Sequence, residues 1–295
     1  MSILAGVDNL IDDWCGLSSA GGVGTGTPLY ANKSAARLLS EHQRPLGSDL
    51  APSDTTELFK NILDQIRGNF RADRQVSDTL WVLRKETGLD PINNKSSEKL
   101  LEKVIASCLD PTSWYNQLTT ASGLRSAHAD KARNIDLVHK RHDGKSAYEF
   151  IELKYQESAD SHGANNPLYA AWEIVCYGLL YVFARTTQKL QSLPHRPLLD
   201  ATKVKKVHLI VLAPEGYYQY KRRAGDYRRY RLEWLEEAIN KGLKSVTVQG
   251  LMIDFVFQKF TPEFGELYNT PKRLPDAFQA FRKNNLSCRE RVYGQ

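Results

Sequence analysis

The chain has 295 residues, of which 41% are hydrophobic, and 40 Lys and Arg side chains against 34 Asp and Glu give it a formal charge of +6. Five Trp, fourteen Tyr and ten Phe exclude a disordered chain, and the length allows one large domain or two smaller ones with a buried core. The four cysteines are far apart and match no zinc-binding spacing, which favours a cytoplasmic protein with reduced thiols.

Residues 1–95 are predicted to be a mainly helical region. Apolar residues spaced by three and four predict amphipathic helices at 54–69 and 75–88. The glycine-rich stretch at 21–28 has no GK[ST] motif and follows no predicted strand, so we interpret it as a loop or linker. The sequence leaves the role of this region open between recognition of a DNA site, binding of a partner and dimerisation.

Residues 96–260 are predicted to form an α/β (α+β) core, a central mixed sheet flanked by helices. The apolar stretch from Leu168 to Ala184 contains an acidic residue and is short for a membrane span, so we expect a core helix and no membrane association. Residues 261–295 are predicted to be a helix at 276–283 and a basic tail. The elements expected in the core are a helix at 96–109, a polar loop-like region to Arg133, a two-stranded hairpin, a helix at 167–192, a strand at 204–212, a basic helix at 226–241 and a strand at 246–257.

The most informative feature is the hairpin, whose two strands are predicted at 134–138 and 148–155. Because side chains alternate along a strand, Glu152 and Lys154 share one face. A hairpin of this length places Asp136 beside Glu152, so two carboxylates and one ammonium meet next to an apolar strand. Charges in that setting are costly unless they are paired or bound to a metal. The pattern predicts an active site, and its alternative is an exposed hairpin with a salt bridge.

These residue types suit metal-assisted phosphodiester hydrolysis. Carboxylate oxygens are hard ligands that suit Mg²⁺, and Mn²⁺ is expected to substitute for it. We assign Asp136 and Glu152 as metal ligands, with the backbone carbonyl of Leu153 as a third. The ion lowers the pKa of a bound water and stabilises the leaving oxygen. Lys154 is then placed to orient the attacking water, or to help deprotonate it, and to stabilise negative charge.

The segments Ile135-Asp136-Leu137 and Phe150-Ile151-Glu152-Leu153-Lys154 resemble the core of the PD-(D/E)xK nuclease superfamily, which has the restriction-endonuclease-like fold. The resemblance covers residues 96–260 and implies that Asp136, Glu152 and Lys154 are catalytic. The residue before Asp136 is Ile135 where the family pattern has Pro, which lowers the specificity of the match.

Two further parts of the family pattern have candidates in this chain. Many members carry a Glu on the helix before the hairpin, and Glu98 and Glu102 both qualify, on one helical face. Glu98 is preferred because it follows a serine N-cap, although an acid at a helix start is also favoured by the helix dipole alone. The stretch from Glu173 to Tyr177 resembles the helix after the hairpin, with a polar residue four before a Tyr.

The excess positive charge is local. Between residues 201 and 231 there are nine Lys and Arg side chains and two acidic ones, and the segment 216–231 interleaves five tyrosines with six cations. Lys and Arg neutralise phosphates, and Tyr rings stack on bases, so the segment is predicted to contact nucleic acid. A solvated basic face, or contact with another polyanion, is the alternative. The predicted contact residues are Tyr217, Tyr218, Tyr220, Lys221, Arg222, Arg223, Arg228, Arg229 and Arg231.

The sequence therefore predicts a Mg²⁺-dependent nuclease, with DNA as the expected substrate. The first alternative is a non-catalytic nucleic-acid-binding or assembly module that retains the nuclease fold. The second is an enzyme acting on another phosphate-bearing substrate. A homodimer is implied by the resemblance alone, and a protein partner stays open, as do the cleavage site and the biological role.

Overall fold

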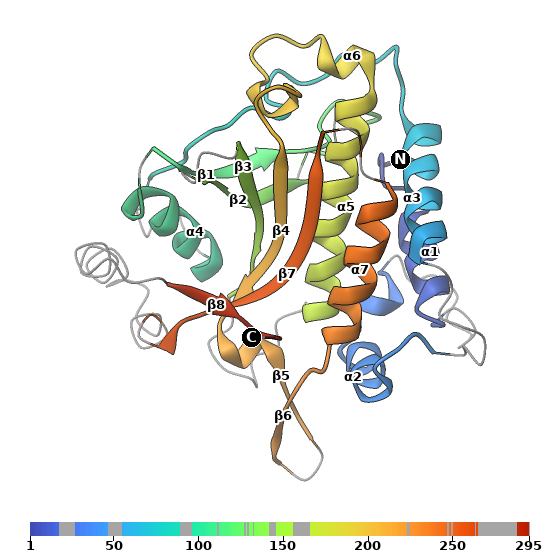
Figure 1. The fold of residues 1–295 in the computed structure, drawn as a ribbon, viewed down its shortest axis with the longest axis vertical. Coiled ribbons are helices and arrows are strands. Elements are labelled where there is room, and N and C mark those ends of the chain that lie inside the picture. The colour runs from blue at the N-terminus through green and yellow to red at the C-terminus, as the bar shows by residue number, and fades with distance from the viewer. Residues whose placement is uncertain are drawn as a thin grey trace.

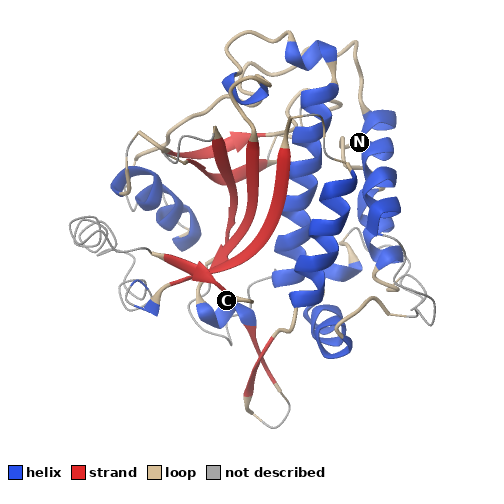
Figure 2. Cartoon of the chain, viewed as in Figure 1, coloured by secondary structure: helices blue, strands red, loops and turns tan. Residues whose placement is uncertain are grey.

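The fold is seen in a computed structural model, in which a twisted mixed sheet lies between helices on both of its faces (Figures 1 and 2). The predicted glycine-rich loop at 21–26, Arg223 and the helix at 276–283 fall outside the described residues. The structure describes residues 1–17, 27–46, 55–88, 96–110, 112–126, 128, 130–131, 133–141, 146–155, 166–222, 225–246, 248, 250–262, 264 and 288–294.

The main sheet has six strands in the order β1-β2-β3-β4-β7-β8. The first three strands pair antiparallel, β3, β4 and β7 pair parallel, and β8 returns antiparallel to β7. Every residue of β3 is buried, as expected for a central strand covered on both faces. The strands are β1 (Trp114–Thr119), β2 (Asn134–Lys140), β3 (Ala147–Leu153), β4 (Lys206–Ala213), β7 (Met252–Phe260) and β8 (Arg289–Arg291), and β5 (Gln219–Lys221) pairs with β6 (Tyr227–Arg229) in a separate two-stranded ribbon.

Helices α5 and α7 cover one face of the sheet, α3 and α1 pack behind them, and α4 lies on the other face (Figure 1). The α-helices are α1 (Val7–Trp14), α2 (Lys33–His42), α3 (Thr55–Asn69), α4 (Ser97–Cys108), α5 (Pro167–Thr186), α6 (Gln188–Gln191) and α7 (Glu233–Ser245). Short 3₁₀ helices are η2 (Leu29–Ala31), η3 (Pro197–Leu199) and η4 (Glu215–Tyr218).

Local sequence signals explain where the two helices that border the candidate site begin. Ser96 caps α4 by accepting a hydrogen bond from the Lys99 backbone N–H. Asn166 caps α5 in the same way through the Tyr169 N–H, and Pro167 occupies the first helical position. Helix α5 is long and apolar enough to cross a membrane by length and composition, but 89% of that stretch is buried inside the protein, as in a core helix.

The N-terminal helices belong to the same hydrophobic core as the sheet. One continuous cluster of buried residues runs from Ile3 through α3, α5 and β4 to Tyr293. Helices α3 and α7 approach so closely that a Cβ atom added at Gly242 would lie 2.6 Å from the ring of Phe59, which is fully buried. The predicted boundary at residue 95 therefore does not separate two cores.

We expect Gly242→Ala to destabilise the protein by about 1–3 kcal/mol, because the new methyl group has no space against the Phe59 ring. The matched control is Gly68→Ala in α3, where nothing lies within 4 Å of the added Cβ. That change should be neutral or stabilising by roughly 0.5–1 kcal/mol. Urea denaturation of both variants measures the difference, and equal stabilities would contradict the close packing of α3 on α7.

The α+β class, the mixed sheet and most of the long elements are confirmed, and four local predictions are wrong. Residues 75–88 form turns and extended chain in place of a helix, and their apolar side chains Val76, Leu80 and Trp81 are buried as a helix would have buried them. The predicted loop after residue 109 contains β1, the predicted helix at 226–241 begins only at Glu233 after β6, and the basic tail contributes β8 to the sheet.

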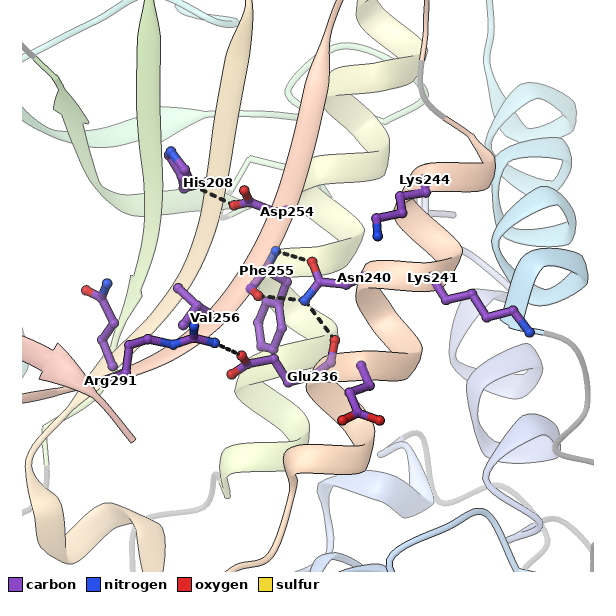
Figure 3. Close-up of a pocket in the computed structure, with 11 residues that line it drawn as sticks. His208, Glu236, Asn240, Lys241, Lys244, Asp254, Phe255, Val256 and Arg291 are labelled. Carbon is purple, nitrogen blue, oxygen red and sulfur yellow. Dashed lines mark hydrogen bonds and ion pairs between the residues drawn. The ribbon is translucent and has the colours of Figure 1, made fainter. Parts of the chain in front are cut away.

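The outer strand β1 and the part of β7 that lies beyond β8 have backbone groups covered by other parts of the chain. Asn240 of α7 accepts a hydrogen bond from the Phe255 N–H at 2.8 Å and donates one to the Phe255 carbonyl at 2.9 Å (Figure 3). Glu236 accepts from the Phe257 N–H at 3.1 Å. These contacts form one wall of an open pocket of about 660 Å³ between α7 and β7. On the opposite edge, residues 81–86 hydrogen-bond to β1, for example through the Asn116 N–H and the Arg84 carbonyl at 3.1 Å.

Candidate active site

The structure brings Asp136, Glu152 and Lys154 together at one end of the sheet. Strands β2 and β3 pair with Leu137 opposite Ile151, which sets Asp136 beside the end of β3. The Leu153 N–H donates a hydrogen bond to Asp136 Oδ2 at 2.9 Å, and Lys154 Nζ lies 2.5 Å from Glu152 Oε1. The Lys154 N–H in turn bonds the Leu212 carbonyl of β4 at 2.9 Å. The two parallel central strands thus hold the cluster in place.

A local distortion of β1 lies opposite Asp136. Asn116 pairs with Leu137 and Leu118 pairs with Ile135, but Gln117 is left out of the register and has a φ of 54°. Positive φ is uncommon for a residue other than Gly, and the distortion is local because the register of β1 and β2 is the same on both sides of Gln117. The Gln117 side chain turns toward α4, where its Nε2 donates to Glu102 Oε2 at 2.8 Å.

Helix α5 adds a third carboxylate. Glu173 Oε2 lies 3.3 Å from Lys154 Nζ, and the Tyr177 hydroxyl donates to Glu173 Oε1 at 3.4 Å. These are the two residues that resemble the post-hairpin helix of the nuclease superfamily. The ammonium of Lys154 is therefore held between two carboxylates from different elements.

Both glutamates proposed on α4 face this end of the sheet. Glu98 Oε2 accepts from the Tyr155 N–H at 3.0 Å, so it is tied to the chain immediately after Lys154. Glu102 is 1% exposed and accepts from Asn116 Nδ2 at 2.9 Å. Both carboxylates interact electrostatically with Asp136. Glu98 raises the pKa of Asp136, and Asp136 adds to the rise that burial causes in the pKa of Glu102. The preference for Glu98 stays a prediction.

Burial makes it costly to keep the side chains of this cluster charged. Glu152 is 3% exposed and Lys154 is 6% exposed. Burial is the main cause that raises the pKa of Glu152 well above its usual range, helped by Asp136 and Glu173 and opposed by Lys154. Burial likewise raises the pKa of Asp136 to about 6, while Lys154 opposes the rise. The Glu152 Oε2 atom is buried and has no hydrogen-bond partner within the described part of the chain.

These pKa shifts predict how stability changes with pH. The pKa of Asp136 is higher in the folded chain, about 6, than its ordinary value of 3.8, so the folded state binds the proton more tightly. Its contribution to folding is therefore most favourable below about pH 4 and is lost as the pH rises through about 6. We expect the metal-free Asp136→Asn variant to gain stability over wild type between pH 4 and pH 7. Urea denaturation in EDTA across this range measures the gap, and a constant gap would contradict the shift.

The residues fit a hard divalent cation by their chemistry. Mg²⁺ is usually held by one or two carboxylates and keeps several waters, which matches Asp136 and Glu152. The unpaired Glu152 Oε2 is an acceptor that such an ion or its water would satisfy. The Leu153 side chain is buried in the core, so only its carbonyl is a candidate ligand. Among the residues that the structure describes, no group of three or more His, Cys, Asp and Glu side chains is arranged to hold a metal ion.

The predicted nucleic-acid segment divides into a buried base and an exposed ribbon. Tyr217 and Tyr218 are 5% and 0% exposed, whereas stacking on a base requires accessible rings. Alternating aromatic and basic residues in the sequence do not reveal which rings turn inward. Tyr220 is half-buried, and the predicted cations on the surface are Lys221, Arg222, Arg228, Arg229 and Arg231.

Tyr217 interacts electrostatically with the candidate cluster, which the sequence did not indicate. It lies in η4, immediately after the end of β4, and its hydroxyl is buried without a hydrogen-bond partner among the described residues. Burial raises the pKa of Tyr217 well above its usual range, Lys154 opposes the rise, and Glu173 and Glu152 add to it. Its hydroxyl therefore lies within the electrostatic field of the cluster. A tyrosine three residues past an Ala-Pro strand end was the only available signal.

His139, in strand β2, lies on the opposite face of the sheet from the cluster. It stacks on Trp114 with ring centroids 4.3 Å apart, and its Nδ1 is 2.6 Å from Glu149 Oε2. On the same face, His208 Nδ1 is 2.6 Å from Asp254 Oδ1. These pairs are in register across four neighbouring strands, so they form a polar row behind the site.

Comparison with protein-family models, with curated proteins and with solved structures finds no match to this chain. The resemblance to the PD-(D/E)xK nucleases thus stays a prediction that depends on the motif residues of the sequence.

Proposed function

We propose that the protein is a metal-dependent nuclease that hydrolyses phosphodiester bonds in DNA. The observation that carries the proposal is the cluster of half-buried Asp136 with buried Glu152 and Lys154, in which one carboxylate oxygen has no partner among the described residues. A protein that needed these charges only for folding gains little from them, because buried ion pairs are weak stabilisers. Strongly perturbed titratable groups gathered in one place are typical of a catalytic site.

Each side chain has a separate task in this proposal. Asp136 and Glu152 hold the cation, which lowers the pKa of water and offsets the charge that develops on the phosphate. Lys154 is fixed by Glu152 and Glu173 and presents its ammonium to the attacking water or to a phosphate oxygen. Glu173 also accepts from Tyr177, so the position of the ammonium is set from α5 as well as from β3.

The test is cleavage of supercoiled plasmid, linear duplex DNA, single-stranded DNA and RNA in Mg²⁺, Mn²⁺ or EDTA. The proposal predicts cleavage that requires the metal and disappears in Asp136→Asn. Salt-sensitive DNA binding without any cleavage would overturn it in favour of a binding module with the same fold. Preferential cleavage of RNA would overturn the choice of DNA.

Tyr217→Phe is expected to lower kcat by about tenfold or more, because it removes a buried hydroxyl that is free to donate to a phosphate oxygen or to the attacking water. The melting temperature and the affinity for DNA should stay close to wild type, since no hydrogen bond of the described chain is lost. Tyr218→Phe is the matched control. Its hydroxyl donates to the Val211 and Gln258 carbonyls, so this change should lower stability more than kcat. An unchanged kcat in Tyr217→Phe would exclude the hydroxyl from the reaction.

A further inference from the structure

The β5–β6 ribbon projects from the body of the protein beyond the end of the sheet (Figure 1). Its strands pair in antiparallel register, with Lys221 opposite Tyr227 and Tyr220 opposite Arg228. All three residues of β6 are exposed. The ribbon and the residues that follow it, to 231, carry five described cations and one carboxylate, Asp226.

The base of the ribbon is anchored firmly. The Tyr218 carbonyl accepts from the Tyr230 N–H at 2.9 Å, and the Tyr230 carbonyl accepts from the Tyr293 hydroxyl at 2.6 Å. Helix α2 supports the same point, since Ser40 Oγ accepts from the Arg231 N–H at 2.7 Å and Arg37 lies over the Tyr220 ring. A rigid base beneath exposed strands suits a ribbon that docks as a preformed unit, and α2 is part of its support.

The charge of the ribbon is only partly neutralised by its own surroundings. Arg229 is paired with Glu215 at 2.5 Å. Arg222 and Arg228 share the single carboxylate of Asp226, at 3.5 and 3.6 Å, and both are exposed. Exposed pairs of this kind are weak and exchange readily for phosphate.

The ribbon is also close to the candidate active site along the chain. Tyr217, whose hydroxyl lies in the field of the catalytic cluster, is four residues before Lys221. An extended chain of four residues spans at most about 14 Å, which is roughly four base pairs of B-DNA. A phosphate bound at the ribbon and a phosphate at the cluster therefore fit on one duplex.

We propose that the β5–β6 ribbon enters the major groove of double-stranded DNA and holds the duplex across the active site. The proposal rests on the nuclease function proposed above for its substrate and names duplex DNA as that substrate. The major groove of B-DNA is about 12 Å wide and admits a two-stranded ribbon. The major groove of A-form RNA is deep and narrow, and a single strand has no groove, so neither offers this fit.

Binding is tested in EDTA with Asp136→Asn, so that cleavage does not interfere. The ribbon variant carries Lys221→Gln, Arg222→Gln and Arg228→Gln in that background. The matched control carries Lys203→Gln, Lys205→Gln and Lys244→Gln, three exposed cations at the other end of the parallel strands. Fluorescence anisotropy compares a 20-base-pair DNA duplex, its single strand and the corresponding RNA duplex over a range of salt concentrations.

The ribbon variant should lose at least tenfold in affinity for duplex DNA, and its salt dependence should become shallower by about 2–3 in log–log slope. The control should lose much less, and single strands and duplex RNA should bind more weakly throughout. Methyl green, which occupies the major groove, should compete, whereas the minor-groove ligand netropsin should not. Equal losses in the two variants, equal binding of duplex RNA, or competition by netropsin alone would overturn the proposal.

These outcomes are separate from those of the nuclease test. Cleavage by wild type with no effect of the ribbon variant would overturn only the docking of the ribbon. Ribbon-dependent binding of duplex DNA by a wild-type protein that never cleaves would overturn only the nuclease function.

Discussion

Asp136→Asn is expected to abolish metal-dependent cleavage, by about a thousandfold or more, without unfolding the protein. Asparagine keeps the size of the side chain and still accepts the hydrogen bond from the Leu153 N–H. It lacks the negative charge that a divalent cation needs from a ligand. Single-turnover cleavage of duplex DNA measures the loss, and the melting temperature in EDTA should be equal to or above that of wild type.

The control for this prediction is Asp254→Asn. Asp254 also lies beside cationic partners on the sheet, at 2.6 Å from His208 Nδ1 and 3.2 Å from Lys206 Nζ, but it belongs to the polar row behind the site. Its loss should leave cleavage within about twofold of wild type. If both variants cleave normally, Asp136 is not a ligand, and if both lose activity, the effect is not specific to the cluster.

Lys154→Met should have the largest effect on stability, a loss of about 3–5 kcal/mol at pH 8, along with the loss of cleavage. The change leaves Glu152 buried and Glu173 beside it without the ammonium that pairs with both. The loss should be smaller at pH 5 than at pH 8, because lower pH favours protonation of Glu152, whose pKa burial raises, and a protonated Glu152 leaves no unpaired charge. Urea denaturation at the two pH values measures it.

Two further variants show whether the missing charge is the cause. Adding Glu152→Gln to Lys154→Met should recover part of the stability at pH 8 but none of the cleavage. Lys206→Met removes a cation from an ion pair that is largely open to solvent, and it should cost less than about 1 kcal/mol. A Lys154→Met variant as stable as Lys206→Met would mean that the cluster is solvated, contrary to its burial.

The strand alternation around Glu152 was sufficient to predict that Asp136, Glu152 and Lys154 lie together at the end of the hairpin strands. Once the two strands pair, few arrangements of their two carboxylates and one ammonium are possible. The long apolar helix after the hairpin was then expected to cover this face of the sheet. Residues that join the site from elsewhere were harder to predict. The Tyr217 side chain is buried and the Lys221 side chain, four residues later, is exposed. The packing of η4 against the sheet determines this difference, and the local sequence does not.

The wrong elements have a common physical cause. Residues 75–88 have helical spacing, yet the chain is used to cover the outer edge of β1, where the Trp81 N–H bonds the Thr119 carbonyl at 2.9 Å. Strand β1 has two adjacent polar residues, Asn116 and Gln117, in place of a regular alternation, and its partners lie on β2, beyond a long connection, so the sequence predicted a loop. Tertiary hydrogen bonds override local propensity in both places.

The covered edges of the sheet have a consequence for self-association. A strand with open backbone groups invites another chain to extend the sheet, and it is a common route to dimers and to aggregates. Here Asn240 and Glu236 hydrogen-bond to backbone groups of β7 in the part of the strand that β8 does not pair with. Residues 81–86 hydrogen-bond to the backbone of β1. Two copies of this chain that met to cut both strands of a duplex would therefore not join by extending the sheet at β1 or at this part of β7. The distance between their two cuts would be set by the surfaces through which they do join.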